Sequence, residues 1–184
     1  MPLTKDITFK CPNCGEEIPL TLWQSVNTAE NPREAEALAY GDLFYIECPK
    51  CGYQTMANYS LLYHDAERGV MIQYIATQDR EERAKEMAEY RKARKESIEA
   101  AKLQDPALAK QLYGSVFRFV TSLNDLREKA LILRAGLDDR YVEIIKSMTL
   151  AIQKQDGETT DVASNRFMID DENKNFIVYF DENG

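Results

Sequence analysis

The chain has four cysteines, and they lie in two short segments of nearly identical sequence, CPNCG and CPKCG. A Cys-x-x-Cys turn can direct two thiolates at one tetrahedral ion, and the glycine that follows permits the left-handed backbone that such a turn needs. Four thiolates make a closed, soft ligand set of the kind that Zn²⁺ takes in structural sites. The sequence therefore predicts one structural zinc ion per chain, bound by Cys11, Cys14, Cys48 and Cys51.

Other uses of these cysteines stay open. A thioredoxin-type redox pair usually opens a helix after a strand, whereas the segments after the two motifs, EEIPLTLW and YQTMANYSLLY, have extended patterns. A catalytic zinc is not favoured, because four protein thiolates leave no open position for water. The alternatives to a purely structural site are a thiol-based regulator that releases zinc on oxidation and a zinc ribbon that binds nucleic acid.

The rest of the sequence contains no arrangement typical of an enzyme. His64 is the sole histidine, and the chain lacks a glycine-rich phosphate loop, a nucleophile elbow and a pair of catalytic carboxylates. His64 and Asp65 are predicted to lie in a turn, where a turn hydrogen bond is favoured over a proton-transfer pair. We therefore predict that the protein is not an enzyme.

Composition argues against several classes of partner. The 184 residues include 23 Lys and Arg against 31 Asp and Glu, for a net charge of −8, which disfavours a general nucleic-acid binder. No apolar segment is long enough to span a membrane, and the first residues lack the apolar core of a signal peptide. We expect a soluble cytoplasmic protein.

The elements that must position the cysteines indicate an α+β fold in three parts. Residues 1–78 are predicted to form a zinc-ribbon-like β domain. Within it, Ile18, Leu20 and Leu22 alternate with other residues as in a strand, and a short helix is expected from Pro32 to a stop at Gly41. Residues 43–47 should form a strand into the second motif, and residues 54–63 should pair with residues 70–75 in a hairpin.

The second predicted part, residues 79–104, is a long connecting helix. Its sequence is highly charged, with acidic and basic residues one turn apart, and its apolar stripe is interrupted at Arg94 and Ser97. This pattern favours a solvent-exposed connector over a coiled coil. Its basic cluster is interpreted as a solvated face and comprises Arg91, Lys92, Arg94 and Lys95.

The third predicted part, residues 105–184, is a helical hairpin with short strands. Gly136 should end the first helix and Asp138 should cap the second. Two apolar stripes are expected to face each other: Leu123, Leu126, Ala130, Leu133 and Leu137 on one helix, and Tyr141, Ile145, Met148 and Ile152 on the other. Residues 115–121 should pair with a C-terminal hairpin. Such a small sheet leaves one face uncovered, so we expect a homodimer through residues 104–184.

Three segments resemble the CpXC family, prokaryotic proteins named for this cysteine motif: CPNCGEEIPLTLWQSVN, ENPREAEALAYGDLFYIECPKCG and YSLLYHDAERGVMIQYI. The resemblance runs from about Lys10 to Ile75 and continues more loosely through SLNDLREKALILRAGLDDR. It implies a zinc-binding ribbon and no particular activity. We therefore expect a zinc-binding interaction or regulatory module whose partner is a protein or a second copy of itself.

Overall fold

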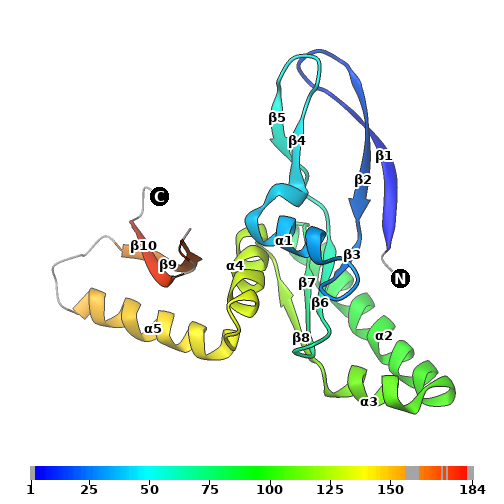
Figure 1. Cartoon of the computed structure of the whole chain (residues 1–184), viewed down its shortest axis with the longest axis vertical. Coiled ribbons are helices and arrows are strands. Elements are labelled where there is room, and N and C mark those ends of the chain that lie inside the picture. Colours follow the sequence, from blue (N-terminus) through cyan, green and yellow to red (C-terminus); the bar gives the residue numbers. More distant parts are fainter. Residues whose placement is uncertain (1–2, 156–161, 171, 173, 182–184) are drawn as a thin grey trace. The chain divides into compact units, whose positions relative to one another are not determined.

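The computed structural model describes residues 3–155, 162–170, 172 and 174–181. It has the predicted mixed α+β architecture, with five helices and ten strands in small sheets among the described residues (Figure 1). The chain divides into two compact units, Met1–Leu126 and Arg127–Gly184. The first unit therefore contains the predicted ribbon, the predicted connecting helix and the beginning of the predicted third part. Each unit is described by itself below.

Two β hairpins in the first unit carry the cysteine motifs. The first pairs β1 (Thr4–Lys10) with β2 (Glu17–Trp23), and the second pairs β4 (Tyr45–Glu47) with β5 (Gln54–Met56). Each motif forms the turn that joins the two strands of its hairpin (Figure 1). This arrangement is the zinc-ribbon-like part that the sequence predicts.

A four-stranded sheet forms the body of the first unit. Its order is β3 (Ser25–Asn27), β6 (Leu61–Asp65), β7 (Val70–Tyr74) and β8 (Val116–Val120). The central pair is antiparallel, and each outer strand lies parallel to its neighbour. The prediction of one strand over residues 54–63 is wrong, because β5 and β6 belong to different sheets. The sheet contributes five of the most deeply buried side chains, Val26, Leu61, Tyr63, Ile72 and Gln73.

The short helix between the hairpins follows the prediction closely. α1 (Pro32–Tyr40) begins with proline and ends at Gly41, which has a φ of 97° and donates its N–H to the carbonyls of Ala37 and Leu38. A 3₁₀ turn, η1 (Asp42–Phe44), follows and buries Phe44 completely. The buried Phe44 therefore fixes the position from which the chain enters β4.

The long charged helix is present and most of its residues are exposed, but one side of it packs on the four-stranded sheet. α2 (Arg80–Gln104) begins at Asp79, whose side chain accepts hydrogen bonds from the N–H groups of Glu81 and Glu82, and is followed by α3 (Pro106–Gly114). α2 lies along the four-stranded sheet, and the guanidinium groups of Arg91 and Arg94 lie 5.0 and 5.3 Å from the ring centroids of Phe119 and Phe117. Arginine can cover aromatic rings while its charge stays near water, so the apolar stripe did not need to be continuous. None of the described helices is both long and apolar enough to cross a membrane.

β8 was expected to pair with the C-terminal hairpin, and this expectation is wrong. β8 pairs with β7 in a register that joins Val116 to Val70 and Val120 to Tyr74. The N–H of Val116 also donates to the Gly69 carbonyl at 2.7 Å. In the second unit, β9 (Val162–Ile169) and β10 (Asn175–Asp181) form a separate antiparallel sheet.

The helical hairpin turns as predicted. α4 (Leu123–Arg134) ends at Gly136, which has a φ of 75°. The N–H of Gly136 donates to the Leu133 carbonyl, and that of Leu137 donates to the Ile132 carbonyl, as in a Schellman motif. Asp138 then caps α5 (Asp139–Gln155) by accepting a hydrogen bond from the Arg140 N–H at 2.9 Å.

The prediction that the apolar stripe of α5 faces α4 is wrong. Tyr141 and Met148 are 67% and 60% exposed, whereas Val142 and Lys146 on another face of α5 are buried. The Lys146 ammonium lies 2.5 Å from the carboxylate of Glu128 on α4. The face of α5 that carries Val142 and Lys146 therefore packs against the core of the second unit. Lys146 is part of this face because a buried carboxylate needs a cation beside it.

Candidate metal centre

The first cysteine motif forms a tight turn with two backbone hydrogen bonds. The Gly15 N–H donates to the Cys11 carbonyl at 2.9 Å, and the Cys11 N–H donates to the Glu16 carbonyl at 2.8 Å. Gly15 has a φ of 73°, in the left-handed region that favours glycine. The turn therefore holds Cys11 and Cys14 on one side of the hairpin tip.

The second motif forms a turn with the same two backbone hydrogen bonds. The Gly52 N–H donates to the Cys48 carbonyl at 2.9 Å, and the Cys48 N–H donates to the Tyr53 carbonyl at 2.8 Å. Gly52 has a φ of 69°. Since the two turns have the same internal geometry, they present two equivalent pairs of thiols.

The structure brings all four predicted ligands together. The Sγ atoms of Cys11 and Cys51 are 3.6 Å apart, as are those of Cys14 and Cys48, and all four lie within 4.8 Å of one another. A tetrahedron with zinc–sulfur bonds of about 2.3 Å has edges of about 3.8 Å, whereas a disulfide bond is about 2.05 Å long. The four cysteines are free thiols, and their spacing fits one tetrahedral metal ion.

The cysteine cluster is buried on one side and exposed to solvent on the other. Cys11 and Cys48 are each 1% exposed, Cys14 is half-buried and Cys51 is exposed. The buried side packs against apolar side chains of the first hairpin, Phe9, Ile18 and Leu20. A metal ion held here would be shielded from water on the side of Cys11 and Cys48. A chelator or an oxidant could approach it from the side of Cys51.

The protein atoms around the sulfurs favour the thiolate form at Cys51 and disfavour it at Cys14. The pKa of Cys51 is lowered to about 6, first by a hydrogen bond from the Asn13 side chain and then by the Tyr53 backbone. At Cys14 the Glu16 backbone acts to lower the pKa, but burial and the other three thiols outweigh it and raise the pKa to about 12. Four adjacent thiolates repel one another, and a divalent cation would remove this conflict.

An ion pair joins the tips of the two hairpins next to the sulfurs. The Lys50 ammonium lies 2.8 Å from a Glu16 carboxylate oxygen. The hydrogen bond that Lys50 donates to this carboxylate raises the pKa of Lys50. Both side chains are largely exposed, so we assign this pair a small contribution to stability.

His64 and Asp65 do not form a proton-transfer pair. His64 lies in β6 rather than in a turn, and burial lowers its pKa against the opposing effect of Asp65. Asp65 instead accepts hydrogen bonds from the backbone N–H and the guanidinium of Arg68, at 3.0 and 3.1 Å. Successive residues of a strand point to opposite faces. Within the described part of the chain, the four cysteines are the only group of His, Cys, Asp or Glu residues arranged to hold a metal ion.

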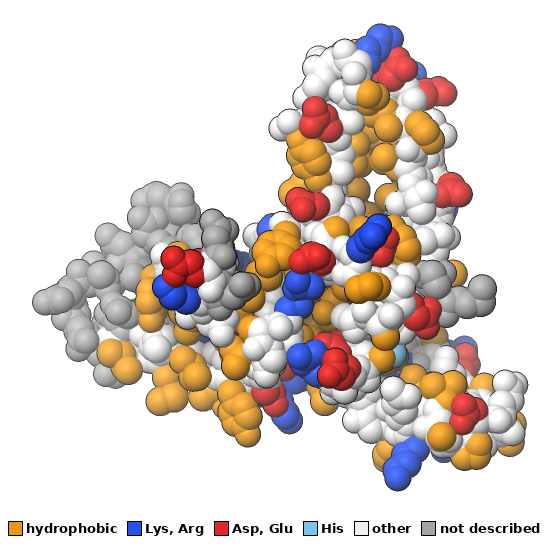
Figure 2. Space-filling view, in the orientation of Figure 1, with side chains coloured by type: hydrophobic (Ala, Val, Ile, Leu, Met, Phe, Trp, Pro, Cys, Tyr) orange, Lys and Arg blue, Asp and Glu red, His pale blue; other side chains and the backbone are white. Residues whose placement is uncertain are grey.

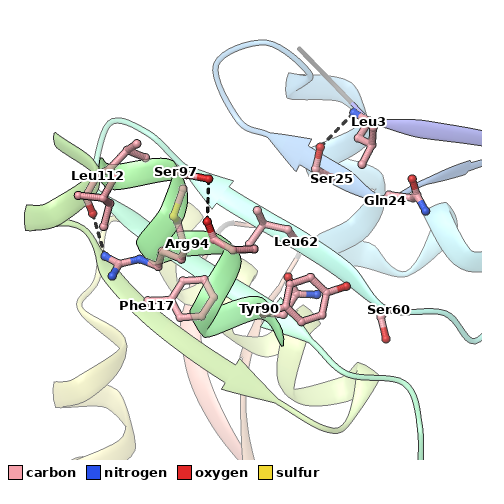
Figure 3. Close-up of a pocket in the computed structure, with 14 residues that line it drawn as sticks. Leu3, Gln24, Ser25, Ser60, Leu62, Tyr90, Arg94, Ser97, Leu112 and Phe117 are labelled. Carbon is pink, nitrogen blue, oxygen red and sulfur yellow. Dashed lines mark hydrogen bonds between the residues drawn. The ribbon is translucent and has the colours of Figure 1, made fainter. Parts of the chain in front are cut away.

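The first unit contains a second candidate site that the sequence does not predict. A cavity of about 340 Å³ lies between α2 and the four-stranded sheet, and its lining includes Arg94 and Gln73 (Figure 3). The interruption of the α2 stripe at Arg94 was the one signal in the sequence. It was interpreted as a break in the apolar face rather than as a charge within it.

The comparisons with known proteins support the assignment of the ribbon. A family model described as CpXC protein matches residues 9–146, which include both cysteine motifs, the four-stranded sheet and α4. No curated protein and no solved structure shows significant similarity to the chain.

Proposed function

The chain belongs to the CpXC family, and on this premise we propose that it is a zinc-binding interaction module in which the metal is structural. The observation that carries the metal assignment is the spacing of four thiols contributed by two separate hairpins. A two-stranded hairpin is marginally stable by itself. Bound Zn²⁺ would supply four metal–sulfur bonds that link Cys11 and Cys14 of one hairpin to Cys48 and Cys51 of the other.

Metal analysis of protein purified without a chelator tests the zinc assignment. We expect about one zinc per chain and a large loss of metal in Cys51→Ser. Lys50→Gln is the matched control, because it changes the adjacent side chain without removing a thiol, and it should retain the metal. A zinc content near zero, or unchanged content in Cys51→Ser, would contradict the proposal. Zinc release by mild peroxide that a reductant reverses would favour the thiol-regulator alternative.

An exposed apolar face on α5 supports a role in interaction. We define the α5 face by five side chains whose exposed fractions range from 49% to 67%: Tyr141, Ile144, Ile145, Met148 and Ile152. Figure 2 shows hydrophobic side chains gathered along this helix. Contiguous exposed apolar surface of this kind is typical of a protein interface.

We assign the α5 face to a second copy of the chain. At roughly 200 Å² for each large side chain, five half-exposed side chains offer about 500 Å² per chain. Two copies would then bury about 1,000 Å², near the lower limit for a specific interface. An antiparallel pair of α5 helices about a two-fold axis would place Tyr141 of one copy near Ile152 of the other. The α5 faces of the two copies would then cover each other.

Sedimentation velocity at tens of micromolar tests this interface. We expect a dimer for the full chain and a monomer for Met148→Lys, because a charge would be buried in the apolar contact. Ser147→Lys is the control, since Ser147 is exposed but lies outside the α5 face. A monomeric full chain, or a dimer that persists in Met148→Lys, would rule out this interface and leave the zinc assignment untouched.

A further inference from the structure

The cavity between α2 and the four-stranded sheet has mainly apolar walls. Its volume is about 340 Å³, and its apolar lining includes Leu62, Met71, Ile98, Leu112 and Phe117. Leu62, Met71 and Phe117 belong to β6, β7 and β8, whereas Ile98 and Leu112 belong to α2 and α3. Figure 3 shows Leu62, Leu112 and Phe117 among the residues that line the cavity. Ligand cavities start at about 300 Å³, so the space suits a small molecule of about ten non-hydrogen atoms.

Arg94 is the only charged residue among the described residues that line the cavity. Its Nη2 donates to the Leu112 carbonyl at 2.8 Å and to the carbonyl and hydroxyl oxygens of Ser115 at 3.0 and 3.2 Å. All three acceptors are neutral. Within the described residues Arg94 forms no ion pair, although the chain as a whole has a net charge of −8. The cavity therefore has an excess of positive charge.

The guanidinium of Arg94 is held in place before any ligand arrives. Its hydrogen bonds tie it to the end of α3 and the start of β8, and its central carbon, Cζ, lies over the Phe117 ring, 5.3 Å from the ring centroid. Its Nε is buried and has no hydrogen-bond partner in the described part of the chain. A cation fixed in this way loses little conformational freedom when it binds an anion.

The other polar groups in the cavity are uncharged. Gln73 is 1% exposed, and its Nε2 donates to the Tyr74 carbonyl at 3.0 Å. Burial raises the pKa of Tyr90, so its hydroxyl stays a neutral phenol at pH 7. Neither group competes with an anion for Arg94.

We propose that this cavity binds a small monocarboxylate with an apolar body. Its carboxylate pairs with Arg94, and its hydrocarbon part lies against Leu62, Met71 and Ile98. A charge-assisted contact to a guanidinium is about twice as strong as a neutral hydrogen bond, so a neutral analogue of the same length should bind more weakly. An amine of that length would place its positive charge beside Arg94 and should be rejected.

Octanoate, octan-1-ol and octylamine test the proposal with the full-length protein, by isothermal titration calorimetry. We expect octanoate to bind once per chain, at least tenfold more tightly than octan-1-ol, and octylamine to give no binding. Failure of octanoate to bind at millimolar concentration would overturn the proposal. Equal binding of octan-1-ol, or any binding of octylamine at this site, would do the same.

Three variants test whether octanoate binds in this cavity. Arg94→Gln should weaken octanoate binding at least tenfold, and Ala93→Phe, which fills the cavity without removing a bond of Arg94, should do so as well. Arg91→Gln is the matched control, because Arg91 also stacks on a phenylalanine but does not line the cavity. Amide chemical-shift spectra establish that each variant is folded. Unchanged affinity in a folded Ala93→Phe protein would show that octanoate binds elsewhere.

Discussion

Glu128 is the side chain that joins the elements of the second unit. It is 4% exposed, and its carboxylate accepts hydrogen bonds from the Lys146 ammonium on α5 and from the Phe167 N–H on β9, at 2.5 and 2.6 Å. Arg166 adds a third contact at 3.2 Å. A single carboxylate on α4 therefore contacts both α5 and β9, beside the apolar cluster of Ile132, Val142 and Phe167.

Removing this carboxylate should destabilise the second unit strongly. Glu128→Ala would leave the Phe167 N–H buried without its acceptor and the Lys146 ammonium with only the more distant carboxylate of Glu143, at 3.4 Å. Loss of one partner of a buried pair costs about 3–5 kcal/mol. Chemical denaturation monitored in the second unit measures the change in the free energy of unfolding. Glu172→Ala serves as the control, since Glu172 and its partner Lys174 are both exposed, and its transition should hardly move. Similar effects of the two substitutions would contradict the assignment.

At the scale of single residues, the cysteines could be predicted from sequence and Glu128 could not. The two cysteine motifs are local, nearly identical patterns, and their internal bonds lie within a few residues of each cysteine. Glu128 depends on partners that lie far along the chain, on α5 and β9. The apolar stripe of Tyr141 and Met148 also dominated the pattern of α5, and sequence periodicity does not distinguish a core face from a face that meets another chain.

Among the elements, the turn between α4 and α5 has the clearest local cause. Gly136 lies at a φ of 75°, and a Cβ added there would meet no heavy atom within 4 Å. The backbone conformation alone therefore makes glycine necessary at this position.

Gly136→Ala should lower the free energy of unfolding by about 1 kcal/mol, the cost of a left-handed conformation for a residue with a Cβ. Gly114→Ala is the matched control, because Gly114 also has open space around it but does not have a positive φ. That substitution should leave stability unchanged or raise it slightly. Thermal unfolding of the two variants compares them directly, and equal destabilisation would contradict the explanation.

Element boundaries were predictable wherever a cap determines them. Pro32 and Gly41 mark the ends of α1, and Asp79 marks the start of α2. Strand partners were not predictable, because pairing joins residues far apart in the sequence: β8 contains the apolar residues of a strand, but nothing within it specifies β7 as its neighbour. The position of α2 on the sheet was missed for a similar reason, since it depends on Phe117 and Phe119 accepting two arginines.

For the whole molecule, the division into two units predicts a localised response to metal removal. In the ribbon, bound zinc should supply on the order of 10 kcal/mol of folding free energy. A chelator should therefore expose the amides of Cys11 and Cys48 to hydrogen exchange, since their acceptors belong to the cysteine turns. The Phe167 amide, which donates to Glu128 in the second unit, should stay protected. Equal loss of protection at all three amides would show that the chain unfolds as one cooperative unit.

The parallel pairing of β8 with β7 has a consequence for biosynthesis. β7 ends at Tyr74, whereas β8 begins at Val116, so the ribosome must synthesise α2 and α3 before the sheet can receive its last strand. Until then, a nascent chain has an unpaired edge on β7, with free backbone donors and acceptors that another strand could occupy. We therefore expect a polypeptide that stalls or is cleaved before Val116 to keep this edge of β7 exposed, even though its cysteine motifs are already complete.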